Sequence, residues 1–361
     1  MKLFKLLKEK AHEKVVIFGD KDLGLNAIIA IHDTTLGPAL GGCRMWGYNE
    51  SKNPLYAGML DALKLSMAMT YKASAAGLDL GGGKAVIVKD PSTISEEERE
   101  KIFIRFGEFV ESLNGKYITA EDVGTNVKDM ANIMKSTKYV VGIPEEYGGS
   151  SDPSPVTAYG VFMGIKACLK EVFGTESLEG KIVAIEGVGN VGYNLAKYLY
   201  KEGAELIVSD IVEEKAERAA KEFNAKITKP GKIYEKKCHI FSPCALGGSL
   251  NSKTIPKLRC KIVAGAANNQ LKNSKSDGER LAKKGILYAP DYVINAGGLI
   301  NVSMEPAISG KPYDREKTLK KVENIYYRLL EIFKISKEKD IPTNVAADLM
   351  AEERIIRARK K

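Results

Sequence analysis

The chain has 361 residues, of which 44% are hydrophobic and 28% charged, and its formal net charge is +9. This length and composition predict a globular protein of two domains, with no apolar run long enough to cross a membrane. Basic residues alternate with acids except in segment 354–361, whereas a nucleic-acid surface needs clustered cations. We therefore expect neither a nucleic-acid nor a membrane partner.

The first residues, 1–14, are amphipathic and lysine-rich but lack the apolar stretch and cleavage site of a signal peptide. They predict a surface helix. The five cysteines form no C-x-x-C pair, which favours a reduced, cytoplasmic protein.

The first part of the chain alternates β-branched runs with segments of helical periodicity, which predicts a mostly parallel α/β sheet. Strands are expected at 15–18, 27–31, 85–88 and 117–120, a loop with a short strand at 36–44, and helices over 54–76 and 95–113. Lys72 then lies near a helix C-terminus. A glycine loop at 81–83 precedes Lys84, and the last strand ends at Glu121 and Asp122.

A segment rich in Gly, Ser and Pro, 142–155, predicts a hinge between domains. Ser154 is the expected N-cap of the helix that follows. Beyond the hinge, helices are expected over 154–172, 191–202, 213–223, 313–335 and 343–359, with strands at 181–186, 205–209, 239–241, 261–264 and 286–289. The α/β fold then comprises two domains separated by a cleft. We expect a substrate-binding, catalytic and oligomerisation domain at 1–145, a Rossmann domain at 146–335, and a C-terminal helix, 336–361, that returns to the first domain.

A dinucleotide-binding turn follows the strand that ends at Glu186. Its residues are Gly187, Val188, Gly189, Asn190, Val191 and Gly192, and a helix follows directly. This G-x-G-x-x-G pattern in its strand–turn–helix context is typical of Rossmann domains, where the helix N-terminus faces the pyrophosphate. Asp210 ends the next strand, where an acid binds the ribose hydroxyls and repels a 2′-phosphate. We therefore expect NAD as the cofactor.

Two lysines and an acid in the first part carry the candidate chemistry. Lys84 follows three glycines, and a second cation with apolar walls should lower its pKa, so that it can act as a base. Lys72 would remain charged and pair with a substrate carboxylate, and Asp122 could carry protons. The pattern is not that of a phosphate loop, because alanine follows Lys84 where Ser or Thr would hold magnesium. We expect no metal ion.

Seven segments carry a resemblance to a known family: 34–46, 69–72, 80–84, 119–125, 153–160, 266–271 and 292–298. The chain resembles the Glu/Leu/Phe/Val amino-acid dehydrogenases nearly from end to end, and is most similar to their leucine-specific branch. The resemblance implies that L-leucine, NAD⁺ and water give 4-methyl-2-oxopentanoate, ammonia and NADH. It also implies homo-oligomers, octamers or smaller, and closure of the cleft.

The resemblance also assigns roles to residues. Lys72 and Asn268 would hold the substrate carboxylate, Lys84 would activate water, and Asp122 would shuttle protons. Thr157 would orient the nicotinamide carboxamide. Further cofactor contacts would come from Asn190, Asp210, Pro243, Ala245 and Asn295.

Substrate choice stays open. The residues that would line the side-chain pocket are Leu40, Gly41, Met69, Ala120, Val141 and Val293. Met69 stands where a glutamate enzyme needs a cation, which favours a branched aliphatic chain. The leucine-specific branch carries threonine where Val141 stands and often alanine at Gly192. One methylene in an apolar pocket discriminates by only about 1–3 kcal/mol, so valine or phenylalanine remains an alternative. From another class, a non-catalytic dinucleotide-binding regulator would have no need of Lys72, Lys84 and Asp122 together.

Overall fold

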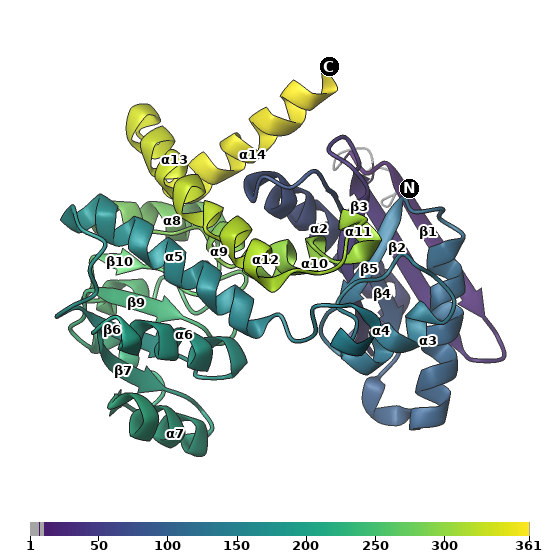
Figure 1. The fold of residues 1–361 in the computed structure, drawn as a ribbon, viewed down its shortest axis with the longest axis horizontal. Helices are drawn as coiled ribbons and strands as arrows, with labels where there is room; N and C mark the ends of the chain where they lie inside the picture. Colours follow the sequence, from purple (N-terminus) through teal and green to yellow (C-terminus); the bar gives the residue numbers. More distant parts are fainter. Residues whose placement is uncertain (1–6, 8–10, 361) are drawn as a thin grey trace. The chain divides into compact units, whose positions relative to one another are not determined.

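The computed structural model describes residue 7 and residues 11–360, so the helix expected over 1–14 lies mostly outside the described residues. The chain forms two compact units (Figure 1). The first comprises Met1–Asp152, Val302–Arg315 and Ala351–Lys361, and the second Pro153–Asn301 and Glu316–Met350. Segment 302–315 thus belongs to the first unit, although the sequence placed it within the nucleotide domain.

The first unit is built on a five-stranded sheet of order β1-β2-β4-β3-β5. Its strands are β1 (Lys14–Asp20), β2 (Leu25–Asp33), β3 (Ala39–Trp46), β4 (Gly81–Val88) and β5 (Tyr117–Glu121). The sheet is mixed: β2 runs antiparallel to both β1 and β4, whereas β3 runs parallel to β4 and β5. The parallel part is the part that carries Lys84 and Asp122.

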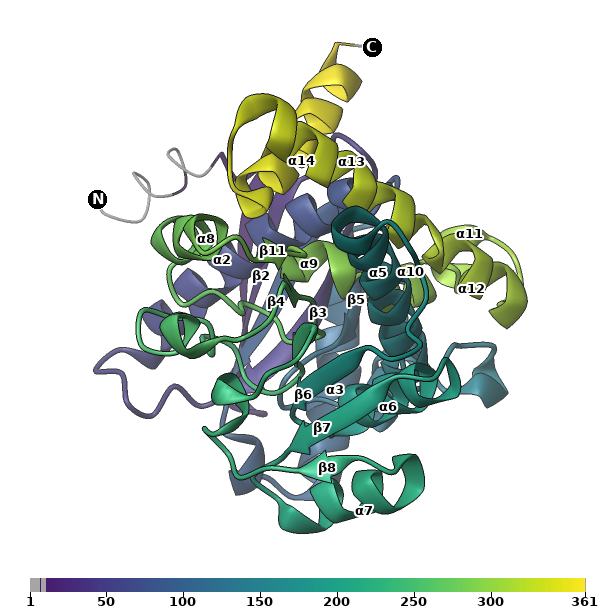
Figure 2. The ribbon, with the colours of Figure 1, turned by 90° about the vertical axis from the view of Figure 1, so that its left-hand side faces the viewer.

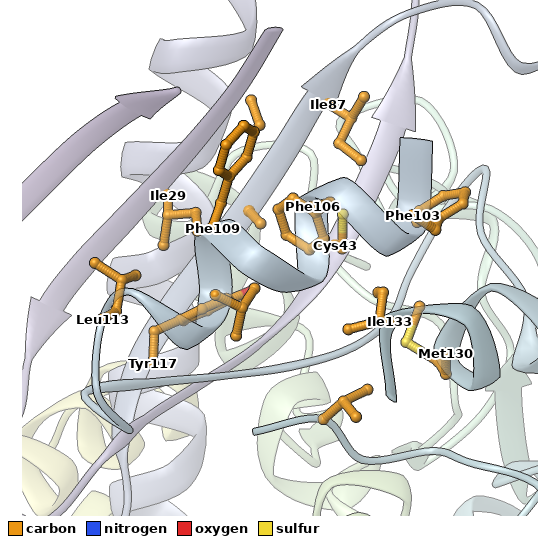
Figure 3. Packing of buried hydrophobic residues seen from close by; sticks show 14 of the residues in the cluster. Ile29, Cys43, Ile87, Phe103, Phe106, Phe109, Leu113, Tyr117, Met130 and Ile133 are labelled. Atoms are coloured by element: carbon orange, nitrogen blue, oxygen red, sulfur yellow. The ribbon is translucent and has the colours of Figure 1, made fainter. Parts of the chain in front are cut away.

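Helices cover both faces of this sheet. They are α2 (Pro54–Ala75), α3 (Glu96–Glu111) and α4 (Val127–Met134). Met59 and Leu63 of α2 pack with Ile28 and Val86 on one face. The opposite face is the larger core, where α3 and α4 cover the side chains around Cys43 (Figure 3). Two short 3₁₀ helices, Pro91–Thr93 and Glu145–Tyr147, complete this part.

The glycines at 81–83 lie in strand β4, so the prediction of a loop there is wrong. A Cβ atom at Gly82 would lie 2.1 Å from the backbone nitrogen of Thr70 in α2, and one at Gly83 would lie 2.6 Å from the ring of Tyr117. The glycines therefore allow the backbone of α2 and the ring of Tyr117 to pack closely against strand β4. Because side chains alternate along a strand, Lys84 points to the same face as Gly82, toward α2.

The second unit is a Rossmann domain with a six-stranded parallel sheet of order β11-β10-β9-β6-β7-β8. Figure 1 labels strands β10, β9, β6 and β7 of this sheet, and Figure 2 labels β11 and β8 at its two edges. Its strands are β6 (Ile182–Glu186), β7 (Glu205–Ser209), β8 (Lys226–Ile227), β9 (Ile240–Pro243), β10 (Ile262–Val263) and β11 (Leu287–Tyr288). The helices expected around it are α5 (Ser154–Phe173), α6 (Asn190–Lys201) and α7 (Glu213–Phe223). Further elements are α8 (Ser274–Lys283), α9 (Asp291–Ile294) and the 3₁₀ helices Ile233–Glu235 and Ile255–Lys257.

The last part of the chain contributes residues to both units. Its helices are α10 (Gly297–Ser303), α11 (Pro306–Ser309), α12 (Arg315–Val322), α13 (Asn324–Lys339) and α14 (Thr343–Arg359). The single helix expected over 313–335 is thus two helices, separated at Glu323, where neither glycine nor proline marks the break. Ser154 is likewise not an N-cap: Pro153 already has helical angles and occupies that position, so Ser154 lies inside α5.

One buried carboxylate ties the returning segment into the first unit. Glu305 is 1% exposed and accepts hydrogen bonds from the backbone nitrogens of Gly142 (3.0 Å) and Ser150 (2.9 Å) and from the Ser150 hydroxyl (2.5 Å). Burial, the larger effect, raises the pKa of Glu305 although these donors oppose the shift. The segment expected to be a hinge is therefore fixed, at both of these residues, to segment 302–315.

Removing this carboxylate should destabilise the fold. Glu305→Ala leaves three buried donors unpaired, at about 1–3 kcal/mol each, so the free energy of unfolding should fall by about 3 kcal/mol or more. Glu305→Gln keeps an acceptor oxygen and should lose less. Urea unfolding followed by circular dichroism measures both. Glu97→Ala, at a side chain 79% exposed, is the control; equal midpoints for Glu305→Ala and Glu97→Ala would contradict the prediction.

Candidate active site

Lys84 and Asp122 form an ion pair within the first unit. The Lys84 Nζ lies 2.9 Å from the Asp122 Oδ2, and the two side chains are 5% and 23% exposed. Lys84 comes from β4, and Asp122 follows β5; β3 lies between these strands. The sheet order thus brings together two side chains that the sequence identified as candidates without showing that they are in contact.

The environment shifts the pKa of both partners downward. Burial is the largest influence on Lys84 and lowers its pKa, although Asp122 opposes the shift. For Asp122, burial acts to raise the pKa, but Lys84 and Arg44 together outweigh it and lower the pKa of the carboxyl group. The carboxylate therefore stays ionised, and the lysine gives up its proton more readily than an exposed lysine does.

Arg44 is a third member of the site, which the sequence analysis missed. Its Nε donates to the Asp122 Oδ2 at 2.8 Å, and its Nη1 donates to the Asp61 Oδ2 at 2.7 Å. The Tyr48 hydroxyl donates to the same Asp61 oxygen at 2.7 Å. The available signal was an arginine inside the otherwise uncharged strand β3.

Glu121, the neighbour of Asp122, has the opposite character. Burial, followed by the nearby carboxylates of Asp152 and Asp122, raises the pKa of Glu121 to about 7. No cation is among the main influences on this side chain. The two adjacent acids thus differ in charge below neutral pH, and Asp122 is the one paired with Lys84.

Helix α2 brings the second lysine to this face of the sheet. The backbone of Thr70 packs directly on Gly82, and Lys72 follows two residues later in the last turn of α2, half-buried. Met69 is half-buried on the same helix. The structure therefore places both residues on the helix that covers Lys84, while their contacts with substrate remain a prediction.

Four of the expected pocket residues lie on neighbouring extended segments of the first unit. Leu40 and Gly41 of β3 are in register with residues 118 and 119 of β5, and Ala120 follows. Val141 is 0% exposed and donates its N–H to the Thr119 oxygen at 2.9 Å. Val293, in α9 of the second unit, is also fully buried.

The dinucleotide-binding turn has the geometry that its sequence predicts. Gly187 has φ +90°, and a Cβ atom there would lie 2.8 Å from the Ala245 side chain. A Cβ atom at Gly192 would lie 2.1 Å from the Gly187 oxygen, whereas one at Gly189 would meet nothing within 4 Å. Protein atoms thus pack directly against Gly187 and Gly192, whereas the space beside Gly189, where α6 begins, is free for a ligand.

Asp210 closes this turn from the neighbouring strand. Its Oδ2 accepts a hydrogen bond from the Val188 nitrogen at 2.8 Å, and its Oδ1 accepts one from the Val212 nitrogen at 3.0 Å. The carboxylate is only partly buried. It therefore lies beside the glycine turn, where the fingerprint places the acid that binds ribose.

The remaining cofactor candidates lie at the same edge of the second sheet. Strand order reverses between β6 and β9, and ligands bind at the carboxyl ends of strands at such a switch point. Pro243 ends β9, and Ala245 lies against Gly187. The Asn295 Nδ2 donates to the Asn268 Oδ1 at 2.7 Å.

Thr157 completes this set within the second unit. Its hydroxyl donates to the Pro153 oxygen at 2.9 Å and lies 2.8 Å from the position of a Cβ atom at Gly298. The open Gly189, the helix N-terminus behind it and the acid at Asp210 together fit a nicotinamide dinucleotide. When bound, that cofactor supplies a hydride acceptor.

Three further observations concern the thiols, possible metal ligands and the helices of the chain. All five cysteines are free thiols. Among residues 7 and 11–360, no cluster of three or more His, Cys, Asp or Glu side chains is suited to a metal ion. None of the helices described is long and apolar enough to span a membrane.

Comparison with known proteins decides the family. Residues 12–139 match the Glu/Leu/Phe/Val dehydrogenase dimerisation domain, and residues 148–212 and 208–361 match the Glutamate/Leucine/Phenylalanine/Valine dehydrogenase domain. The chain belongs to the Glu/Leu/Phe/Val dehydrogenase family. It is therefore an amino-acid dehydrogenase, and the family resemblance predicted from its motifs is confirmed.

Individual members of the family are similar over nearly their whole length. A leucine dehydrogenase of Geobacillus stearothermophilus is 55% identical over 100% of this chain and 95% of its own. An L-tryptophan dehydrogenase of Nostoc punctiforme is 48% identical over 98% of this chain and 96% of its own. The crystal structure of L-tryptophan dehydrogenase from Nostoc punctiforme superposes with a TM-score of 0.86 at 46% identity, covering 99% of this chain and 100% of that one.

Proposed function

We propose that the protein catalyses the NAD-dependent oxidative deamination of a branched-chain L-amino acid, with L-leucine as the leading substrate. The products would be 4-methyl-2-oxopentanoate, ammonia and NADH. The observation that carries the proposal is the ion pair, at 2.9 Å, between the buried Lys84 and the partly buried Asp122. A regulator that only binds a dinucleotide has no use for a buried lysine of lowered pKa beside an ionised carboxylate.

The two groups suit the proton transfers of this reaction. A lysine of lowered pKa can take a proton from the water that attacks the substrate imine. Asp122, held ionised, can accept a proton from the substrate amine and return it to the leaving ammonia. Lys72, with Asn268 as its expected counterpart, is assigned to the substrate carboxylate. These roles rest on the family pattern and on the Lys84–Asp122 geometry.

The pocket residues favour an aliphatic side chain. Leu40 and Val141 are buried and apolar, and Met69 offers no charge for a distal carboxylate. The similar proteins include both leucine and L-tryptophan dehydrogenases. Leucine is therefore the first substrate to test, and valine and phenylalanine are the alternatives within the family.

NAD rather than NADP is the proposed cofactor because Asp210 is an acid beside the turn. Asp210→Ala should raise the Kd for NADH about tenfold or more, from the lost ribose hydrogen bonds. The Kd for NADPH should change less or fall, because the repulsion of its 2′-phosphate is removed. Fluorescence titration measures both constants, with Asp340→Ala as the control; a Kd ratio equal to that of the wild type would refute the assignment.

Assembly and location complete the proposal. We infer a homo-oligomer, an octamer or smaller, in the cytoplasm. Within the described residues β1 is an edge strand paired only with β2, and it exposes Ile17 at 53%. An edge strand with an exposed apolar side chain invites pairing with another copy. The matched dimerisation domain covers this strand.

An amino-acid panel tests the function directly. Purified protein is mixed with NAD⁺ and, separately, L-leucine, L-isoleucine, L-valine, L-phenylalanine, L-tryptophan and L-glutamate at alkaline pH, and absorbance at 340 nm is followed. The branched-chain substrates should give the highest kcat/KM. Preference for an aromatic substrate would move the specificity within the family, and no absorbance rise with any substrate would refute an active dehydrogenase.

A further inference from the structure

Arg44 contacts the catalytic pair without being needed for any step assigned so far. Two cations share one acceptor: the Asp122 Oδ2 lies 2.9 Å from the Lys84 Nζ and 2.8 Å from the Arg44 Nε. The Arg44 side chain is only 23% exposed. The second cation on this oxygen requires an explanation, because Lys84 alone would already neutralise the Asp122 carboxylate.

The other end of the guanidinium is anchored by a second carboxylate. The Arg44 Nη1 lies 2.7 Å from the Asp61 Oδ2, on α2, and the Tyr48 hydroxyl donates to the same oxygen at 2.7 Å. A planar guanidinium held through Nε and Nη1 has little freedom to rotate. Arg44 therefore stays on Asp122 whatever the protonation state of Lys84.

We propose that Arg44 is the positioning residue of this site: it holds Asp122 in place as a permanent counter-ion, so that Lys84 can release its proton without leaving a partly buried carboxylate unpaired. The inference rests on the proposed function, in which Lys84 must become neutral to activate water. With Lys84 protonated, two cations face two carboxylates. After the proton leaves, Arg44 still bridges both Asp122 and Asp61.

The electrostatics of the site agree with this arrangement. Burial lowers the pKa of Lys84 most, Asp122 raises it, and Arg44 lowers it further. Cys43 faces the opposite core, and burial raises its pKa well above the usual range, so it stays neutral. Other titratable groups on the elements packed around the pair are Glu121 of β5, whose pKa is about 7, Tyr71 and Lys72 of α2, His32 of β2, and Tyr48, and the proposed variants leave all of them in place.

Two substitutions should move the titration of Lys84 in opposite directions. Arg44→Gln removes a cation, so the pH at which Lys84 is half deprotonated should rise by about one unit. Activity at a pH on the rising limb should then fall about tenfold and recover at higher pH. Asp61→Asn removes an anion that neutralises Arg44, so the titration should move to lower pH. Arg44→Lys keeps the charge and should restore most of the wild-type profile.

The measurement is the pH profile of kcat/KM for L-leucine with saturating NAD⁺, together with acetylation of Lys84 by acetic anhydride across pH, read by mass spectrometry. The labelling reports the free amine without turnover. It therefore tests Arg44 even if the wild type proves inactive, an outcome that would count against the proposed function alone. Arg105→Gln is the matched control, because Arg105 of α3 also bridges two carboxylates, Asp20 of β1 and Glu108 of α3.

The opposite signs make the outcome decisive. An upward shift for Arg44→Gln and a downward shift for Asp61→Asn, with Arg105→Gln unchanged, would support the positioning role. A lower kcat with unshifted profiles in both variants would show that Arg44 only stabilises the fold. Shifts of the same sign in both variants would also overturn the proposal. Should Arg44→Gln fail to fold, Asp61→Asn carries the test alone: a downward shift would support the proposal, and an unshifted or upward-shifted profile would overturn it.

Discussion

Replacing Lys84 by alanine should lower kcat for L-leucine by about 10³-fold, the size of effect that a positioned general base contributes. The alanine leaves no amine at the position from which water would be activated. The glycine turn and Asp210 belong to the second unit and are unchanged, so the Kd for NADH should remain near the wild-type value. Steady-state absorbance at 340 nm and NADH fluorescence titration measure the two quantities.

Lys89→Ala is the matched control for this experiment. Lys89 follows the same strand, β4, and forms its own ion pair with Glu98 at 2.7 Å. It should retain most of the wild-type kcat. If Lys84→Ala and Lys89→Ala were equally active, Lys84 would have no part in proton transfer.

Replacing Asp122 by asparagine should have the second large effect. Asparagine cannot carry a proton away from the substrate amine, and general acid–base groups contribute about 10²–10⁴-fold. The change also leaves Lys84 and Arg44 without their shared carboxylate, so the thermal midpoint should fall as well. A combined loss of kcat and stability distinguishes this variant from Lys84→Ala, which leaves Asp122 paired with Arg44.

Asp79→Asn is the control for the second substitution. Asp79 also pairs with an arginine, Arg354, at 2.7 Å, but its side chain is 92% exposed. Exposed pairs contribute little, about 1 kcal/mol or less. Asp79→Asn should therefore resemble the wild type, and Asp122→Asn at wild-type kcat would rule out the shuttle.

The nucleotide domain could be predicted closely because its signals are local. The strand Glu205–Ser209 and the helix Glu213–Phe223 have the boundaries that their periodicity indicates. The structure also explains the glycines of the turn, because Gly187 and Gly192 occupy positions where a side chain would collide with the protein. Gly192 packs on the oxygen of Gly187, which is close in the sequence, whereas Ala245, the neighbour of Gly187, is distant in the sequence.

The first unit was harder because its chemistry depends on contacts between distant residues. The glycines before Lys84 looked like a loop, yet they are a strand that α2 and Tyr117 pack against. Arg44 gave no local sign that it shares an oxygen of Asp122 with Lys84. Periodicity carries no information on which strands become neighbours, and the order β4-β3-β5 brings these residues together.

The returning segment shows the same limit. The break at Glu323 and the inclusion of residues 302–315 in the first unit leave no mark in the apolar pattern. Glu305 is buried and accepts hydrogen bonds from three donors, but in the sequence it was likewise indistinguishable from a surface glutamate. Buried polar groups are identified by their partners, and those partners lie far away along the chain.

Hydride transfer from the amino acid is the reaction on which every assigned role depends. L-leucine deuterated at Cα, mixed with NAD⁺ and the wild-type protein, should give NADH that carries the deuterium, together with one equivalent of 4-methyl-2-oxopentanoate, both read by mass spectrometry. Lys84→Ala should give neither product at the same rate. Unlabelled NADH, or labelled NADH formed equally fast by Lys84→Ala, would contradict deamination at the Lys84–Asp122 pair.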